Sequence, residues 1–334
     1  MIAIIHTVPQ VKVKYDWGYK THPNGGTVER KVPYTRGKVM GGSASVNGMV
    51  FVRGNRKNFD GWAAQGCEGW SWDDVLPLYK RMENWEGGAS DIRGTGGPIE
   101  VTKSGNLSPV SFAYQDAVAK TCGVDVLDDY NGPKQEGVGV VQVSAKDGLR
   151  YSTSQAYIQP NIHRESLDIQ MRATVLGLEL DGTRVTGVRY EQDGQVKVAH
   201  ATREVILSAG AVGSPQIMML SGIGPAAQLA QHGIDCKLDL PVGQNLHDHL
   251  LFPMTFLAPR GGHKGTPLHF FSSLMREVTR GGTWLGRSVF EIFAFVRSGL
   301  KPSDHPPDLQ LHSMPWAYPA NQDDSTKRPE VDKR

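Results

Sequence analysis

The chain has 334 residues, which is enough for about two domains at roughly 100–200 residues each. Lys and Arg number 36 against 34 Asp and Glu, so the formal net charge of +2 excludes a strong electrostatic case for a nucleic acid or an anionic membrane surface as partner. Three widely spaced cysteines favour neither a disulfide framework nor a zinc site, and no apolar run matches a membrane span or a secretory signal, so we expect a cytoplasmic protein.

The first regular segment is a predicted amphipathic helix. Residues 73–82 carry apolar side chains at helical spacing, with Asp73 or Asp74 as the N-cap residue and Pro77 in the first turn, where proline is tolerated. The glycine-rich run 86–98 follows and must be a loop. This loop either crosses the surface or covers a site, and the sequence favours the surface.

The middle of the chain predicts a second helix and then a β-meander. The helix covers residues 111–122 and ends at Gly123, which suits the left-handed conformation that often follows a helix. Short β-rich runs come next, separated by the hairpin signals Asp181-Gly182 and Asp193-Gly194. These runs cover residues 167–172, 175–180, 185–190 and 196–199.

A strand, a glycine turn and a helix start are predicted in that order after the meander. Residues 205–207 are compact and apolar, as in a buried strand. Ser214 suits the N-cap and Pro215 the first position of a helix that Gly222 ends. The N–H groups at such a helix start favour a phosphate or a carbonyl-rich ring edge, and the glycines before it allow close approach of a ligand.

An earlier glycine-rich segment has a similar capacity to contact a ligand. Gly41 and Gly42 permit positive φ angles and close approach of the backbone. Ser43, Ser45 and Asn47 offer hydrogen-bond donors for carbonyl and pyrophosphate oxygens. The sequence therefore predicts two separate stretches of backbone that can lie against a cofactor.

Two other groups of residues are candidate sites. His247 and His249 are two residues apart, so they would share one face of a strand. No carboxylate or third histidine stands at ligand spacing, and no metal site is therefore predicted. Trp62, Trp70 and Trp72 can form either a wall for a quaternary ammonium group or part of a hydrophobic core. Tryptophans that flank a helix favour the core.

The two glycine-rich segments, Arg36–Asn55 and Leu207–Pro225, together resemble the glucose-methanol-choline (GMC) family of FAD-dependent alcohol oxidoreductases. Shorter stretches extend the resemblance from about residue 15 onward, and these are 172–175, 243–249 and 307–312. The resemblance implies an α/β fold with an FAD/NAD(P)-binding-type flavin domain and a β-meander over residues 1–252. It also implies the start of a substrate-binding domain with an antiparallel sheet over residues 253–334.

The resemblance further implies that the cofactor is FAD, bound without a covalent link. Val46 stands where covalently flavinylated members have histidine, and residues 47–50 correspond to the part nearest the isoalloxazine ring. Val175 corresponds to a valine whose backbone meets the adenine. The expected FAD-binding residues are Gly41, Gly42, Ser43, Asn47, Gly48, Met49, Val50, Val175, Ala209 and Gly210.

By the same resemblance the chain is a choline dehydrogenase-like oxidoreductase, which oxidises the CH–OH group of a small-molecule alcohol by hydride transfer to flavin N5. The family's first βαβ unit and its C-terminal catalytic histidine have no counterpart among these residues, so no catalytic residue is assigned. We expect the chain to be a portion of such an enzyme and to be inactive alone. The alternative is a non-catalytic remnant or a partial subunit that needs another chain; no oligomeric state is predicted.

Overall fold

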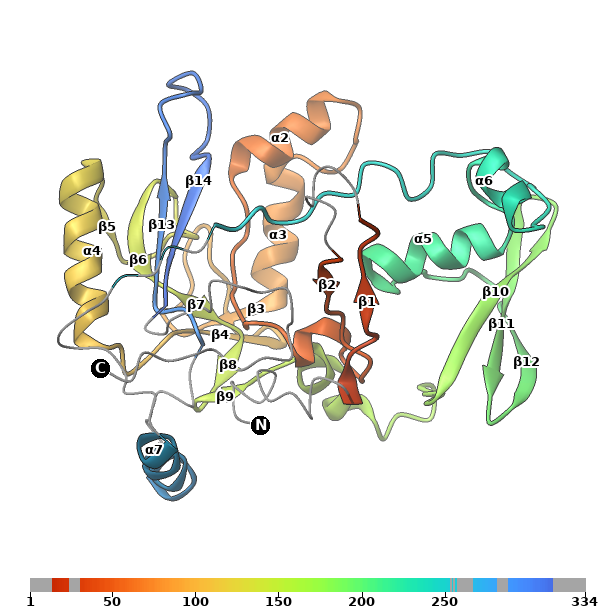
Figure 1. Ribbon diagram of the computed structural model, residues 1–334, viewed down its shortest axis with the longest axis horizontal. Helices are drawn as coiled ribbons and strands as arrows, with labels where there is room; N and C mark the ends of the chain where they lie inside the picture. The colour runs from red at the N-terminus through yellow and green to blue at the C-terminus, as the bar shows by residue number, and fades with distance from the viewer. Residues whose placement is uncertain are drawn as a thin grey trace. The chain divides into compact units, whose positions relative to one another are not determined.

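The computed structural model contains two compact units (Figure 1). Unit 1 comprises Met1–His163 and Pro253–Arg334, and unit 2 comprises Arg164–Phe252. The structure describes residues 14–23, 31–252, 254, 256, 267–280 and 288–314. Much of the range 253–334, where the start of a substrate-binding domain is expected, therefore lies outside the described residues.

A four-stranded sheet forms the centre of unit 1, in the order β14-β13-β6-β5. Its strands are β5 (Val126–Leu127), β6 (Gly137–Val140), β13 (Ile292–Val296) and β14 (Leu309–Ser313). Strand β13 runs antiparallel to both of its neighbours, whereas β5 and β6 are parallel. Strand β14 contains most of the stretch 307–312, which by resemblance is a strand of the substrate-binding domain's sheet, and the sheet joins segments far apart in the sequence.

The two faces of β13 are buried in different hydrophobic clusters, because successive side chains of a strand point to opposite faces. Ile292, Ala294 and Val296 pack in a cluster with Val118 of helix α4 (Pro109–Cys122). Phe293 and Phe295 pack on the other face in a second cluster, whose further members are Met49, Tyr130, Val141, Val143 and Ala145. Helix α4 ends as predicted, because Gly123 adopts the left-handed conformation with φ 63°.

Two short helices follow the first glycine-rich segment, α2 (Arg56–Ala64) and α3 (Trp72–Met82). The helix predicted over 73–82 is confirmed, but its cap is not. Ser71 is the N-cap: its side chain accepts from the Asp74 backbone while the Asp74 carboxylate accepts from the Ser71 backbone, a reciprocal capping box. Because the helix begins at Trp72, Pro77 lies beyond the first turn, inside the helix.

The glycine-rich loop predicted over residues 86–98 is confirmed. It connects two parallel strands, β3 (Glu83–Trp85) and β4 (Ile99–Lys103), of a small sheet that β7 (Gln142–Val143) completes. The loop packs tightly on the end of α3, since a Cβ added at Gly94 would meet the Lys80 carbonyl at 1.9 Å. Glycine is therefore required by the approach of two backbones.

The remaining elements of unit 1 are short. Two hairpins pair β1 (Tyr19–Lys20) with β2 (Pro33–Tyr34), and β8 (Ala145–Lys146) with β9 (Leu149–Arg150). Three helical turns are η3 (Gly42–Ser45), η4 (Ser154–Ile158) and η5 (Gln159–Asn161), and the last helix is α7 (Pro267–Arg280). Among the residues that the structure describes, no helix combines the length and the apolar composition that a membrane span needs.

Unit 2 contains the predicted β-meander, with β10 (Ala173–Asp181), β11 (Arg184–Gln192) and β12 (Gln195–His200) in sequence order. Both hairpins turn at the predicted Asp-Gly pairs, where Asp193 and both glycines have positive φ. The strand predicted over residues 167–172 is wrong: the backbone there is irregular and turns with φ 55° at Arg172, just before β10 begins.

The helix region of unit 2 differs from the prediction in two respects. Residues 205–207 form no strand, because no strand described in unit 2 runs beside them, and the Ile206 side chain is 78% exposed. The following helix, α5 (Gly210–Leu220), starts before Ser214, so that Pro215 lies inside it. Helix α5 ends just before Gly222, the residue that the sequence predicted as its end, and helix α6 (Ala226–Gln231) follows.

Candidate functional site

The first glycine-rich segment folds into a tight crossing that only glycine permits. Gly41 adopts φ 86° and begins the 3₁₀ turn η3. A Cβ added at Gly37 would lie 2.4 Å from the Gly42 carbonyl oxygen, and one at Gly41 would lie 2.7 Å from Ser45 Oγ. Thr153 holds the crossing from the side, because its hydroxyl donates to the Gly41 carbonyl at 3.2 Å.

Gly42 differs from these glycines because its missing side chain faces open space. Its φ is 56°, and a Cβ added there would have no atom within 4 Å. Next to it, the exposed Ser43 accepts a hydrogen bond from the Gly37 N–H through Oγ at 3.2 Å. The backbone at Gly42 is half-buried, and its open side forms a cradle in which a ligand can come closer than any side chain would allow.

A polar turn follows the cradle and is held by a buried arginine. Asn47 Oδ1 accepts from the Met49 N–H and from Arg150 Nη1, both at 2.9 Å. The same guanidinium donates to the Ala44 carbonyl at 3.1 Å and to the Asn47 carbonyl at 2.6 Å. Burial lowers the pKa of Arg150 to about 10, so the group stays charged at neutral pH.

Residues 48–50 connect this turn to the hydrophobic core. Met49 has φ 63°, unusual for a residue with a side chain, and that side chain is 3% exposed within the cluster around Phe293. The Gly48 carbonyl accepts from Ser288 Oγ at 2.9 Å, and Val50 forms a bridge with Val143. Because the Met49 side chain is buried, any ligand contact at this position involves its backbone.

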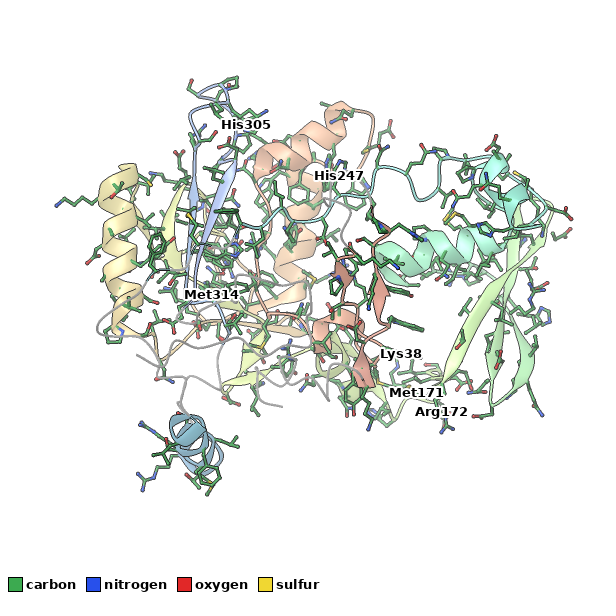
Figure 2. The ribbon with its side chains drawn as sticks, in the orientation of Figure 1. Lys38, Met171, Arg172, His247, His305 and Met314 are labelled. Carbon is green, nitrogen blue, oxygen red and sulfur yellow. The ribbon has the colours of Figure 1, made fainter. Side chains whose placement is uncertain are left out.

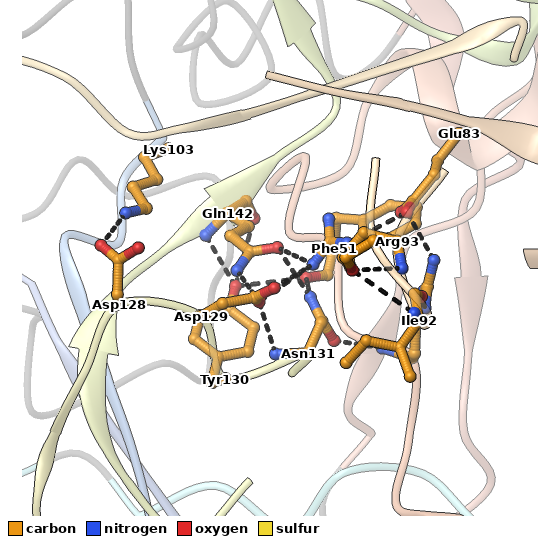
Figure 3. Close-up of polar contacts among 12 residues, drawn as sticks. Phe51, Glu83, Ile92, Arg93, Lys103, Asp128, Asp129, Tyr130, Asn131 and Gln142 are labelled. Carbon is orange, nitrogen blue, oxygen red and sulfur yellow. Dashed lines mark hydrogen bonds and ion pairs between the residues drawn. The ribbon is translucent and has the colours of Figure 1, made fainter. Parts of the chain in front are cut away.

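A buried network of charges includes Arg53, near the end of the first glycine-rich segment (Figure 3). Glu83 Oε1 accepts from Arg53 Nη2 at 2.5 Å, from Arg93 Nε at 3.0 Å and from the Gly94 N–H at 2.7 Å. Arg93 Nη1 also contacts both carboxylate oxygens of Asp129, at 2.9 and 3.1 Å. Two arginines and two carboxylates therefore balance their charges inside unit 1.

Neutral polar side chains complete the network. The Gln142 side chain donates to Asp129 at 2.6 Å and accepts from Arg93 at 3.0 Å. Asn131 Oδ1 accepts from the Arg53 backbone N–H at 2.8 Å. Burial raises the pKa of Tyr130, so its phenol stays protonated and donates to the Phe51 carbonyl at 3.2 Å. The network thus holds residues 51–53 in place relative to the sheet.

Unit 2 contains the other three expected FAD-binding residues. Val175 lies in β10 opposite Tyr190, just before an irregularity in the pairing. Ala209 is the N-cap of α5, and Gly210, with φ 84°, has no atom within 4 Å of an added Cβ. Ser214 is not the cap residue; its Oγ accepts from the Ala209 N–H at 2.9 Å and so closes the first turn.

The other candidate groups, the tryptophans and the histidines, do not form a site among the described residues. The core prediction is confirmed for Trp72, which is buried with Phe59 and Val75. It is wrong for Trp62 and Trp70, which are exposed and meet edge to face at 5.9 Å between ring centroids. His247 lies on the extended segment after α6 and is exposed (Figure 2). Within the described part of the chain, no three His, Cys, Asp or Glu side chains gather as a metal site would require. All three cysteines are free and exposed.

These observations fit FAD at the level of local chemistry. Gly42 and Gly210 leave open space beside the backbone, Asn47 is exposed, and the first turn of α5 contains no acidic residue that would repel a phosphate. Seven expected contact residues lie together in unit 1 between Gly41 and Val50. Arg150 was not among the expected residues, although Asp147-Gly148, the turn before it, has the same hairpin signal as the two turns of the meander.

Comparison with known proteins places these features in a family. The sequence profile of GMC oxidoreductases matches residues 21–251. An oxygen-dependent choline dehydrogenase of Sinorhizobium medicae is 40% identical over 317 residues, which cover 92% of this chain and 56% of that protein. The enzyme of the same name from Brucella anthropi is 39% identical over 313 residues, which cover 91% and 55%. The chain thus spans about half the length of the curated relatives it matches.

Solved structures agree with this match. Pyridoxine 4-oxidase from Mesorbium loti is 30% identical with a TM-score of 0.65, and the alignment covers 68% of this chain and 45% of that protein. A formate oxidase of Aspergillus oryzae, studied for FAD modification, is 27% identical with a TM-score of 0.74 and covers 86% and 53%. The α/β flavin-binding fold class and FAD as the cofactor, both expected from the resemblance, are confirmed. Because the family profile covers well over half of its residues, the chain belongs to the GMC oxidoreductase family.

Proposed function

We propose that this chain supplies the flavin-facing part of an FAD-dependent oxidoreductase that acts on the CH–OH group of a small-molecule alcohol. The observation that carries the proposal is the open cradle at Gly42, followed directly by the exposed Asn47 turn. The names of the matched relatives favour choline or a similar alcohol as the substrate. Since those relatives extend well beyond the match, the activity of the whole protein belongs to the proposal.

The chain's own residues would bind and orient the cofactor. FAD, when bound, supplies the acceptor for the hydride that an alcohol loses on oxidation. The Gly42 backbone allows the close approach, the Asn47 side chain offers a donor to a flavin carbonyl, and the first N–H groups of α5 offer donors to a phosphate. Residues 48–50 contact the hydrophobic core and so hold the neighbouring Gly42 and Asn47 backbone in place. No described residue is assigned as the base that takes the hydroxyl proton.

We also propose a flavin-binding region over residues 1–252 and the start of a substrate-binding domain over 253–334. The protein would act in the cytoplasm, and its partner would be a small molecule rather than a nucleic acid or a membrane. The β13–β6 pairing, which links residues 137–140 to 292–295, supports a substrate-binding part that is built directly onto the flavin-binding part.

The proposal is tested with a completed protein, in which the parts of the Sinorhizobium medicae relative outside its match are joined to this chain. We expect the purified completed protein to be yellow and to reduce a dye when choline is added, whereas the 334-residue chain alone shows no alcohol-dependent reduction. A completed protein without flavin would contradict the proposal. Bound flavin without reduction by any alcohol would favour the non-catalytic remnant instead.

The linkage to FAD gives a separate prediction. Valine has no nucleophilic atom, so Val46 cannot form a bond to the flavin ring. Heat or acid denaturation of the yellow completed protein should therefore release all of its FAD into the supernatant, as measured by absorbance and fluorescence after precipitation. Flavin that stays with the precipitated polypeptide would show that another residue makes a covalent link.

A further inference from the structure

We propose that Arg150 is a positioning residue, which sets the Asn47 side-chain amide so that its N–H groups face the flavin. The proposal rests on the proposed function, because it concerns how this chain meets FAD. Arg150 is 4% exposed, whereas Asn47 is exposed, so the guanidinium acts on the turn from its buried side.

The orientation of the amide follows from the groups around it. The Met49 N–H and Arg150 Nη1 are both donors and cannot accept, and both lie 2.9 Å from the same terminal atom of Asn47. That atom must be the acceptor Oδ1. Nδ2 is therefore the other terminal atom, and among the described residues no acceptor bonds to it. An exposed side chain fixed in this way presents a donor, which matches the carbonyl oxygens of a flavin ring.

The guanidinium fork makes this control possible. Arg150 contacts the Asn47 carbonyl and the Ala44 carbonyl as well as Oδ1, so one rigid planar group sets both the backbone and the side chain of the turn. Lysine would keep the positive charge but lose the fork, because an ammonium group on a flexible stem cannot hold three acceptors in one plane. Arg150→Lys thus separates positioning from charge.

The test is a double-mutant cycle on the completed protein, read by the flavin midpoint potential and by the Kd for FAD. We expect Arg150→Lys to weaken FAD binding about ten-fold and to shift the potential when Asn47 is present. In the Asn47→Ala background the same change should have little further effect, because there is no amide left to orient. Arg53→Lys is the matched control: Arg53 is equally buried in unit 1 and has no bond to Asn47, so its effect should be the same in both backgrounds.

A second variant keeps the proposal open to refutation if Arg150→Lys does not fold. Asn47→Asp preserves an acceptor for Met49 and Arg150 but removes the donor, so the melting temperature of the apoprotein should stay near that of the unchanged protein while FAD binding weakens about ten-fold. Equal effects of Arg150→Lys in both backgrounds, or unchanged FAD binding by Asn47→Asp, would overturn the positioning role and leave the proposed function intact. An unchanged completed protein that holds no flavin would overturn both.

Discussion

Gly42→Val should abolish FAD retention by the completed protein. The missing side chain of Gly42 faces open space within the expected cofactor segment, so a valine there places a branched group where the cofactor must approach. A clash between protein and ligand cannot be relieved by rotating the side chain, because every valine rotamer occupies that space. We expect a colourless protein after purification, and a loss of FAD binding by more than about a hundred-fold in a fluorescence titration.

Backbone strain must be separated from this clash, because φ at Gly42 is 56° and valine is disfavoured there by about 1–2 kcal/mol. Gly123→Val provides the matched control. Gly123 has φ 63°, lies in the same unit and also has no atom within 4 Å of an added Cβ, but it ends α4 outside the cofactor segment. The control should lose similar stability and stay yellow. A yellow Gly42→Val protein would show that this backbone does not lie against FAD.

Glu83→Gln should strongly destabilise unit 1. Glu83 is fully buried and accepts from Arg53, Arg93 and the Gly94 N–H through one oxygen. Glutamine has almost the same shape but no charge, so two buried arginines are left with Asp129 alone. Removing one member of a buried ion network typically costs about 3–5 kcal/mol. We expect a clear fall in the urea midpoint, followed through the fluorescence of Trp85, whose ring lies 4.1 Å from the Arg93 guanidinium carbon.

Glu136→Gln is the control for this prediction. Glu136 forms an ion pair of 2.8 Å with Arg297, but both side chains are about one third exposed, and pairs of this kind contribute at most about 1 kcal/mol. The two variants remove the same charge from the same unit. If they shift the urea midpoint equally, the buried network does not hold unit 1 together.

The sequence was informative wherever one residue determines a local conformation. Gly123 ends α4, and Asp181-Gly182 turns the first hairpin of unit 2, because these residues tolerate positive φ. The cap of α3 was misplaced although its signal is local. Asp74 forms only half of a reciprocal pair, and the other half, Ser71, stands three residues earlier.

The rest depended on partners that lie far away in the chain. Residues 205–207 have the apolar composition of a buried strand, but a strand also needs a neighbour, and without one in unit 2 Ile206 is exposed. Arg150 and Asn47 are 103 residues apart, so neither residue type indicates their contact. The first glycine-rich segment could be recognised because its ligand-contacting residues are consecutive in the sequence. Arg150, which contacts that segment, is far from it in the sequence and could not be recognised in the same way.

The position of β13 between β6 and β14 has a consequence for how the protein forms in the cell. Strand β6 is synthesised long before its partner β13, and the whole of unit 2 emerges from the ribosome between them. The meander of unit 2 consists of neighbouring hairpins, so it can form early, while the central sheet of unit 1 must wait for residues 292–296. During that interval β6 and the Met49 cluster lack their partners from β13, so apolar surface that is buried in the finished protein is still uncovered.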